Sequence, residues 1–124
     1  MIELLLDIPG LPDNAVAFSG KGEIVASDYE TVLIPAIDEK LKTHKKVRIL
    51  FHLGPEFTGY SMGAMWDDTK MGLEHMLSWE KLAIVSDKEW IRHLSKFFGF
   101  MAPHLLKVYS NDQLDEAIEW IREI

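Results

Sequence analysis

The residues best suited to chemistry lie in one short stretch, TGYSMGAMWDD, at positions 58–68. Ser61 stands just before a predicted helix, where free backbone N–H groups favour a phosphoryl group. A serine at this place is also a common N-cap, because its side-chain oxygen accepts a hydrogen bond from the first helical turn. We therefore predict that Ser61 caps the helix, with phosphorylation of the same hydroxyl as the alternative.

The acidic and imidazole side chains predict neither a metal site nor a catalytic centre. Asp67, Met71 and His75 would share one face of that helix, but the sequence has no His-x-x-x-His or His-x-x-Glu-His element. It also lacks a glycine-rich phosphate loop and a Gly-x-Ser-x-Gly elbow. His52, late in a predicted strand, is expected to be a buried imidazole with a hydrogen-bond partner. We therefore expect a non-catalytic protein without a metal or another cofactor.

Methionine and aromatic residues are concentrated in and after the opening stretch, which points to binding. Methionine is flexible and polarizable, so a surface rich in it adapts to varied apolar ligands. Part of the set must fill the core, but Met71 lies off the apolar stripe of its helix, so packing does not explain it. Phe100 and Met101 lie in a predicted turn, as an exposed patch or as a lid over the core. The predicted ligand- or membrane-binding residues are Tyr60, Met62, Met65, Trp66, Met71, Trp79, Phe97, Phe98, Phe100 and Met101.

The composition narrows the class of protein and its partners. At 124 residues the chain is long enough for one domain, which we place at residues 1–124. Its formal charge of -7 repels phosphate backbones, so nucleic acid is not an expected partner. The absence of cysteine fits a reducing cytoplasm, and no apolar run reaches the roughly twenty residues that span a bilayer. We expect a cytoplasmic protein, able to contact a membrane peripherally, with an apolar edge around Phe100 that a homodimer would bury.

Short apolar runs predict the strands that position these residues. MIELLLDI and NAVAFSGKGEIV, separated by the turn-forming PGLPDN, are expected to pair antiparallel. VRILFHLG is apolar on both alternating faces, which is typical of a central strand, and is expected to end at Gly54 and Pro55. KLAIVS and LLKVY are the remaining predicted strands.

Four helices are predicted between and after these strands. Three begin at capping boxes, which pair Ser27 with Glu30, Ser86 with Glu89 and Ser110 with Gln113. Pro35 should kink the first helix or loosen a turn in it. The helix that follows the opening stretch should run over 61–77. The predicted inner faces are Met62, Met65, Trp66, Thr69, Leu73, Met76 and Leu77 in this helix and Trp90, Leu94, Phe97 and Phe98 in the next.

The order of these elements predicts an α/β fold. Two strands come first, and each later strand is separated from the one before it by a helix, so a mostly parallel sheet with right-handed crossovers and helices on both faces is expected.

Several segments together resemble the SpoIIAA-like family, and the match covers nearly the whole chain. They are FTGYSMGAMWDDTKMGLEH, KLAIVSDKEW, a late proline at Pro103 and the closing EAIEWI. The most specific matching residues are Gly59, Ala64, Trp66, Asp67, Asp68, Gly72, His75, Ala83, Val85, Asp87, Trp90, Ala117 and Trp120.

The resemblance implies the STAS fold of anti-sigma-factor antagonists, with a five-stranded, mostly parallel sheet, one antiparallel edge strand and four helices. It also implies a small non-catalytic domain, similar in shape to lipid-carrying Sec14 (CRAL-TRIO) domains, that binds an apolar or amphipathic molecule, a membrane surface or a protein partner. The antagonist branch carries a phosphorylatable serine in Asp-Ser-x-Gly. Ser61 and Gly63 match that motif, but Tyr60 replaces its aspartate. This departure favours ligand binding over a phosphorylation switch.

Overall fold

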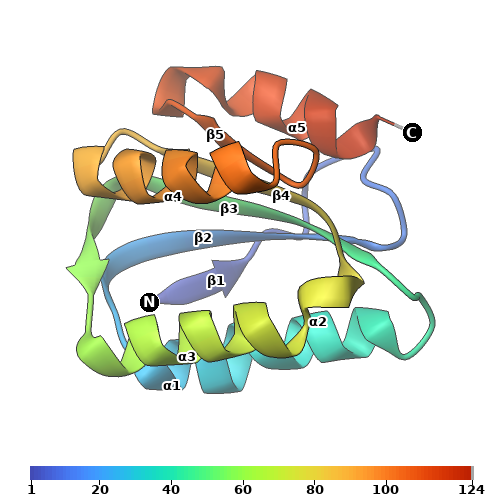
Figure 1. Cartoon of the computed structure of the whole chain (residues 1–124), viewed down its shortest axis with the longest axis horizontal. Coiled ribbons are helices and arrows are strands. Elements are labelled where there is room, and N and C mark those ends of the chain that lie inside the picture. The colour runs from blue at the N-terminus through green and yellow to red at the C-terminus, as the bar shows by residue number, and fades with distance from the viewer. Residues whose placement is uncertain (124) are drawn as a thin grey trace.

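The computed structural model describes residues 1–123, except for the side chains of Phe98 and Met101. Five strands form one sheet in the order of the chain, β1-β2-β3-β4-β5 (Figure 1). The strands are β1 (Ile2–Leu4), β2 (Ala15–Ile24), β3 (Val47–Tyr60), β4 (Trp79–Ser86) and β5 (Leu106–Tyr109). The first pair is antiparallel and the other three pairs are parallel. This arrangement confirms the predicted α/β class and the antiparallel edge strand.

The helices follow the predicted order. The first consists of α1 (Ala26–Asp28), a π-helical segment (Tyr29–Leu33) and α2 (Ile34–Leu41). After β3 come α3 (Met62–Glu74) and a 3₁₀ turn (Met76–Ser78), and after β4 comes α4 (Glu89–Met101). A 3₁₀ turn (Asn111–Gln113) leads into α5 (Leu114–Arg122).

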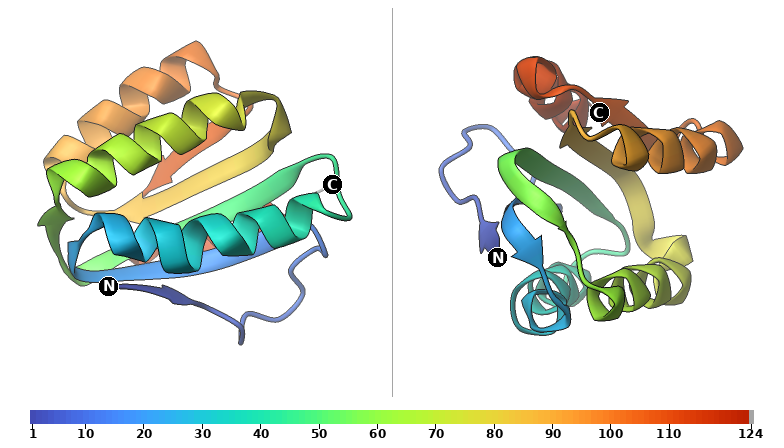
Figure 2. Two further views of the ribbon diagram at one scale, coloured as in Figure 1. Left: turned by 90° about the horizontal axis from the view of Figure 1, so that it is seen from below. Right: turned by 90° about the vertical axis from the view of Figure 1, so that its left-hand side faces the viewer.

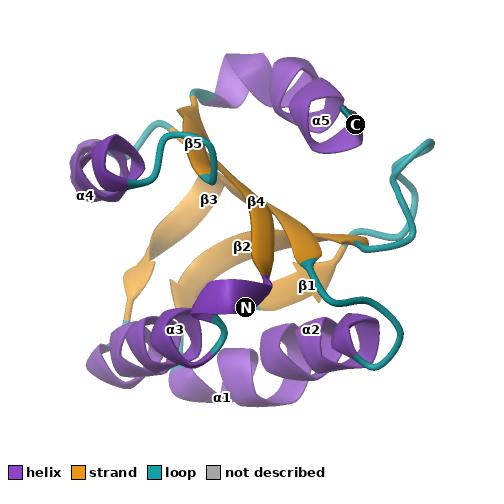
Figure 3. Cartoon of the chain, turned by 45° about the vertical axis from the view of Figure 1, so that its right-hand side comes forward, coloured by secondary structure: helices purple, strands orange, loops and turns teal. Residues whose placement is uncertain are grey.

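Helices cover both faces of the sheet, as Figure 3 shows, with α1, α2 and α3 on one side and α5 on the other. The larger core includes Phe18, Phe51 and Phe57 of the sheet packed against the first helix and α3, and Ile91 of α4 joins it. A smaller core on the opposite face packs Leu50 against α5. The site described below therefore lies on the side of the larger core.

The sheet also holds the end of α5. Arg48 donates to the carbonyl of Ile121 at 2.7 Å, and Lys81 donates to the carbonyls of Trp120 and Glu123 at 2.7 Å each. The last carbonyls of a helix have no partner within it, and they carry partial negative charge. Two cations from β3 and β4 supply those partners.

The first helix corrects one detail of the sequence prediction and confirms another. It begins at Ala26, so Ser27 is not its cap; instead the Asp28 carboxylate accepts a hydrogen bond of 2.8 Å from the Val25 N–H. The loosened turn predicted from Pro35 is present, because the residues before it are π-helical and the N–H of Ile34 reaches back to the carbonyl of Tyr29.

The prediction that the central strand ends at Gly54 and Pro55 was wrong, since β3 continues to Tyr60. Beyond Leu53 the strand pairs only with β2, because β4 ends opposite it at Ser86. One side of β3 is therefore a free edge at that point, where a proline costs the sheet no hydrogen bond. The extension carries Tyr60 to the start of α3.

The capping of the later helices differs from the sequence prediction in one case. The hydroxyl of Ser86 accepts a hydrogen bond of 3.1 Å from the Lys88 N–H rather than closing a box with Glu89. The N–H of Ser110 donates to the side-chain oxygen of Gln113 at 3.0 Å, as predicted.

Candidate functional site

Helix α3 packs through its small residues and exposes its large ones. Ala64 is fully buried, and a Cβ added to Gly63 would lie 3.2 Å from the Cβ of Ala26, so α1 and α3 approach closely here. Met71 is buried as well. The predicted inner face of this helix is therefore wrong: Met62 is 89% exposed and Trp66 68% exposed. The large apolar side chains exposed on α3 and its final turn are Met62, Met65, Trp66, Leu73, Met76 and Leu77.

Helix α4 is also rotated relative to the prediction. Ile91 fills the core, whereas the predicted inner residues Trp90 and Leu94 are more than 40% exposed. Phe97 is 62% exposed and Phe100, which falls within α4 rather than in a turn, is 86% exposed. The side chains of Phe98 and Met101, which also belong to the predicted binding set, lie outside the described part of the chain.

We call the exposed large apolar side chains of the two helices and of the turn after α3 the α3–α4 surface. Its members are Met62, Met65, Trp66, Leu73, Met76, Leu77, Trp90, Leu94, Phe97 and Phe100. Of the predicted binding residues, Met71 and Trp79 are buried instead. The indole N–H of Trp79 donates to the carbonyl of Gly72 at 3.2 Å, which ties β4 to the end of α3. Core packing thus explains the apolarity of Met71, contrary to the sequence interpretation.

A cavity of about 190 Å³ separates the two halves of the α3–α4 surface. Helices α3 and α4 stand apart in the right-hand view of Figure 2. Side chains from both helices line the cavity. It is lined by Phe51, Leu53 and Ile84 of the sheet, Tyr60, Met65, Asp68 and Thr69 at and within α3, and Trp90, Ile91, Leu94 and Ser95 of α4. Tyr60 and Met65 were predicted as binding residues. Asp68 was not predicted, although it follows the buried Ala64 by one helical turn, on the side of α3 that faces Tyr29.

At its polar end the cavity is lined by the Asp68 carboxylate and the Tyr60 phenol, and a second phenol, that of Tyr29, contacts both. Tyr29, which is fully buried, donates a hydrogen bond of 2.7 Å to Asp68, and its hydroxyl lies 3.5 Å from that of Tyr60. Asp68 lines the cavity and is exposed to solvent. The surrounding protein nevertheless desolvates its carboxylate and raises its pKa, while the hydrogen bond from Tyr29 opposes that rise. Burial, and the negative charge of Asp68, raise the pKa of both tyrosines, so the phenols stay protonated donors.

Aromatic rings surround this polar end. The rings of Tyr60 and Trp90 meet edge-on with their centroids 6.0 Å apart, and Phe57 packs against Tyr60 at 5.4 Å. Tyr60 and Trp90 also line the cavity. The site therefore combines an apolar floor, aromatic walls and a single acidic group.

Ser61 occupies the N-cap of α3, as predicted. Its hydroxyl oxygen accepts a hydrogen bond of 3.1 Å from the Ala64 N–H, and its own N–H donates to the carbonyl of Ile24 at 2.8 Å. The side chain is half-buried. Phosphorylation of this hydroxyl remains a prediction.

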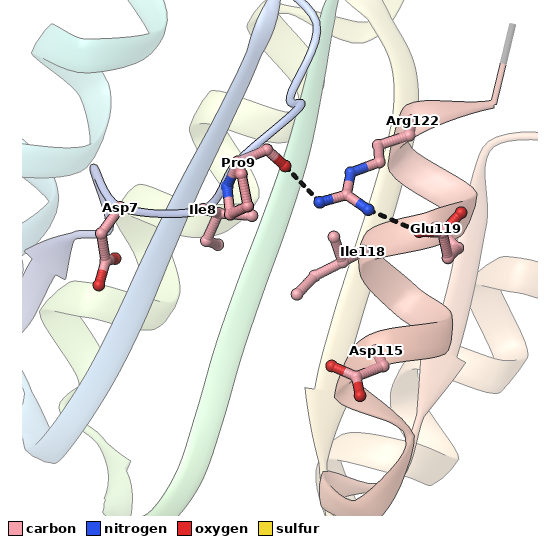
Figure 4. Close-up of a pocket in the computed structure, with 7 residues that line it drawn as sticks. All are labelled: Asp7, Ile8, Pro9, Asp115, Ile118, Glu119 and Arg122. Carbon is pink, nitrogen blue, oxygen red and sulfur yellow. Dashed lines mark hydrogen bonds and ion pairs between the residues drawn. The ribbon is translucent and has the colours of Figure 1, made fainter.

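Other polar features form no comparable site. His52 is half-buried, and burial lowers its pKa. Within residues 1–123, no group of three or more histidine, aspartate or glutamate side chains could hold a metal ion. A larger hollow of about 500 Å³ lies between the segment that follows β1 and α5 (Figure 4). Its basic residue, Arg122, is already engaged by Glu119 at 2.5 Å and by the carbonyl of Pro9.

Comparisons with known proteins agree with this architecture. The model of the SpoIIAA-like family matches residues 15–122. An uncharacterized protein with a SpoIIAA-like fold from Shewanella loihica superposes with a TM-score of 0.76, at 24% identity, over 97% of this chain and 93% of its own. The anti-sigma factor antagonist SpoIIAA in its unphosphorylated form superposes with a TM-score of 0.61, at 13% identity, over 100% of both chains. No curated protein matches in sequence.

The described helices are all too short or too polar to cross a membrane.

Proposed function

The chain belongs to the SpoIIAA-like family, and from this premise we propose that it is a non-catalytic binding domain for a small apolar or amphipathic, lipid-like molecule. The molecule is held in the cavity between α3 and α4, and the flanking α3–α4 surface covers the rest of it or rests on a membrane or a protein partner. The observation that carries the proposal is the exposure of large apolar side chains on both sides of that cavity.

The cost of that exposure is the physical argument. Each exposed apolar Å² leaves about 25 cal/mol of burial energy unused, and soluble monomers rarely expose contiguous apolar patches beyond roughly a few hundred Å². Met65 of α3 and Trp90 and Leu94 of α4 belong to the α3–α4 surface and also line the cavity. A ligand seated there would contact both helices at once.

Mass spectrometry of extracted protein tests the proposal. Protein purified without detergent is extracted with organic solvent, and in parallel it is mixed with liposomes and floated. We expect a small apolar molecule in the extract or protein in the floating fraction. An empty extract combined with no flotation on neutral or anionic lipid would contradict the proposal.

Two variants test whether the ligand binds in the cavity. Leu94→Gln places a polar group in the cavity lining, whereas Leu6→Gln makes the same change at an exposed position outside both the cavity and the α3–α4 surface. We expect the extracted molecule to be depleted from Leu94→Gln and retained by Leu6→Gln. Equal retention by both variants would mean that the ligand binds outside the cavity.

A second candidate function is a signalling switch of the anti-sigma-factor-antagonist kind, regulated by phosphorylation of Ser61. It is supported by the N-cap position of Ser61 and by the similar fold of the antagonist SpoIIAA. A phosphate there would face free N–H groups of α3. If Ser61→Glu and Ser61→Ala captured the same protein partners as the unmodified chain, with equal affinity, this candidate would be dropped.

A further inference from the structure

We propose that the ligand of the α3–α4 cavity carries a positively charged head, an organic ammonium group that pairs with Asp68, attached to a short apolar chain. This inference rests on the proposed binding function and specifies its ligand class.

Asp68 is an acid without a cation. One of its carboxylate oxygens accepts the hydrogen bond from Tyr29, and it forms no ion pair among the described residues, where the nearby Lys70 is paired with Glu74 at 4.0 Å instead. Asp68 is exposed to solvent and lines the cavity, so a charged donor that enters the cavity can reach the carboxylate and form a charge-assisted hydrogen bond with it. The second oxygen of Asp68 therefore remains for a donor that enters from the cavity.

The walls beside Asp68 also favour a cation. Tyr60 and Trp90 line the cavity and are in ring contact with each other. Aromatic faces attract ammonium groups through the quadrupole of the ring, most strongly for tryptophan and where water is excluded. The hydroxyl of Tyr60 adds an acceptor for an ammonium N–H. An anionic head would instead lie against the carboxylate of Asp68 and be repelled.

The size of the cavity sets the size of the ligand. Its volume of about 190 Å³ is smaller than pockets that enclose drug-sized molecules, which hold roughly 300–1,000 Å³. A head group and the first part of a chain fit, and a longer chain would continue outward between Met65 and Leu94, which are partly exposed.

Isothermal titration with three matched probes tests the inference. Octylammonium, octan-1-ol and octanoate share one chain length and differ in the charge of the head. At neutral pH and low salt, below the micelle concentration of each probe, we expect octylammonium to bind at least tenfold more tightly than octan-1-ol, and octanoate to bind most weakly.

Asp68→Asn identifies the group responsible, because an asparagine keeps the acceptor for Tyr29 and removes the charge. This variant should bind octylammonium and octan-1-ol with affinities within threefold of each other. Glu74→Gln removes the same charge from the outer end of α3, away from the cavity lining, and should keep the tenfold preference.

The outcomes separate the two proposals. If octan-1-ol or octanoate binds the unmodified protein as tightly as octylammonium does, the ammonium inference is overturned and the binding function stands. If none of the three probes binds, the binding function itself fails and the inference with it. Should Asp68→Asn not fold, the ranking of the probes on the unmodified protein still decides.

Discussion

The hydroxyl of Tyr29 donates a hydrogen bond of 2.7 Å to the carboxylate of Asp68, joining the first helix to α3 at the inner end of the cavity. Tyr29 has no exposed surface, so its ring is held by the core and its hydroxyl is aimed by that packing. The carboxylate is thereby fixed at the cavity wall rather than free to turn outward. This contact links the stability of the domain to the geometry of its candidate site.

Removing the Tyr29 hydroxyl should destabilise the protein. Tyr29→Phe leaves the Asp68 carboxylate without its donor, at an expected cost of about 1–2 kcal/mol in the free energy of unfolding, measured with urea at pH 7. Tyr109→Phe is the matched control, because the hydroxyl of Tyr109 makes no hydrogen bond with the described residues. That variant should change stability by less than about 0.5 kcal/mol. Equal effects of the two changes would assign no special role to the contact with Asp68.

The raised pKa of Asp68 predicts a pH-dependent contribution to stability. Because the folded state holds the proton more tightly than the unfolded state, this contribution is fully present below the ordinary aspartate pKa of 3.8 and is lost as pH rises through the raised value. The groups that face Asp68 with shifted pKa values are Tyr29 and Tyr60, which titrate far above this range. Asp68→Asn should therefore gain stability relative to the unmodified protein between pH 4 and pH 7. A difference in unfolding free energy that is constant over this range would contradict the assignment.

Loss of the α3 cap should be measurable and reversible. Ser61→Ala removes the acceptor for the Ala64 N–H and should cost about 1 kcal/mol in the free energy of unfolding. Ser61→Asp restores an acceptor of good capping geometry, so it should recover most of that loss. If both variants were equally destabilised, the hydroxyl would have a role beyond capping.

Two glycines of α3 provide a matched pair for the close approach of α1. Gly72→Ala adds a methyl group into open space and should stabilise the helix by up to about 1 kcal/mol. Gly63→Ala makes the same change 3.2 Å from the Cβ of Ala26, so the helices must move apart slightly and the gain should be lost or reversed. Thermal unfolding of the two variants checks the difference in sign. A similar gain from both would mean that α1 and α3 can separate freely.

The sequence was sufficient for the order of elements and for the caps at Ser61 and Ser110, because these depend on local chemistry. Helical spacing on its own could not set the rotation of α3. It assigned the Met62–Leu77 stripe to the core because that is where apolar residues usually lie. The actual rotation is set by partners distant in sequence, namely Ala26 against Gly63 and Tyr29 against Asp68.

The same limitation applies to α4 and to the candidate site. Among the described side chains of α4, Ile91 is the one buried in the core, and this orientation leaves Trp90 and Leu94 beside the cavity. In the sequence, Asp68 is one of two adjacent acidic residues, and no local pattern distinguishes it from Asp67. Its place opposite a buried tyrosine of another helix becomes apparent only when both helices are packed on the sheet.

The α3–α4 surface also has a consequence for how copies of the molecule behave in solution. The chain has a formal charge of -7 and also exposes the apolar α3–α4 surface, so two opposing forces act between copies. At physiological ionic strength charge repulsion extends over about 8 Å, and in 1 M salt over about 3 Å, whereas attraction between apolar surfaces is not screened. Dilute buffer should therefore keep the molecules dispersed, whereas concentrated salt should promote their association through the α3–α4 surface, as salt does for charge-stabilised colloids.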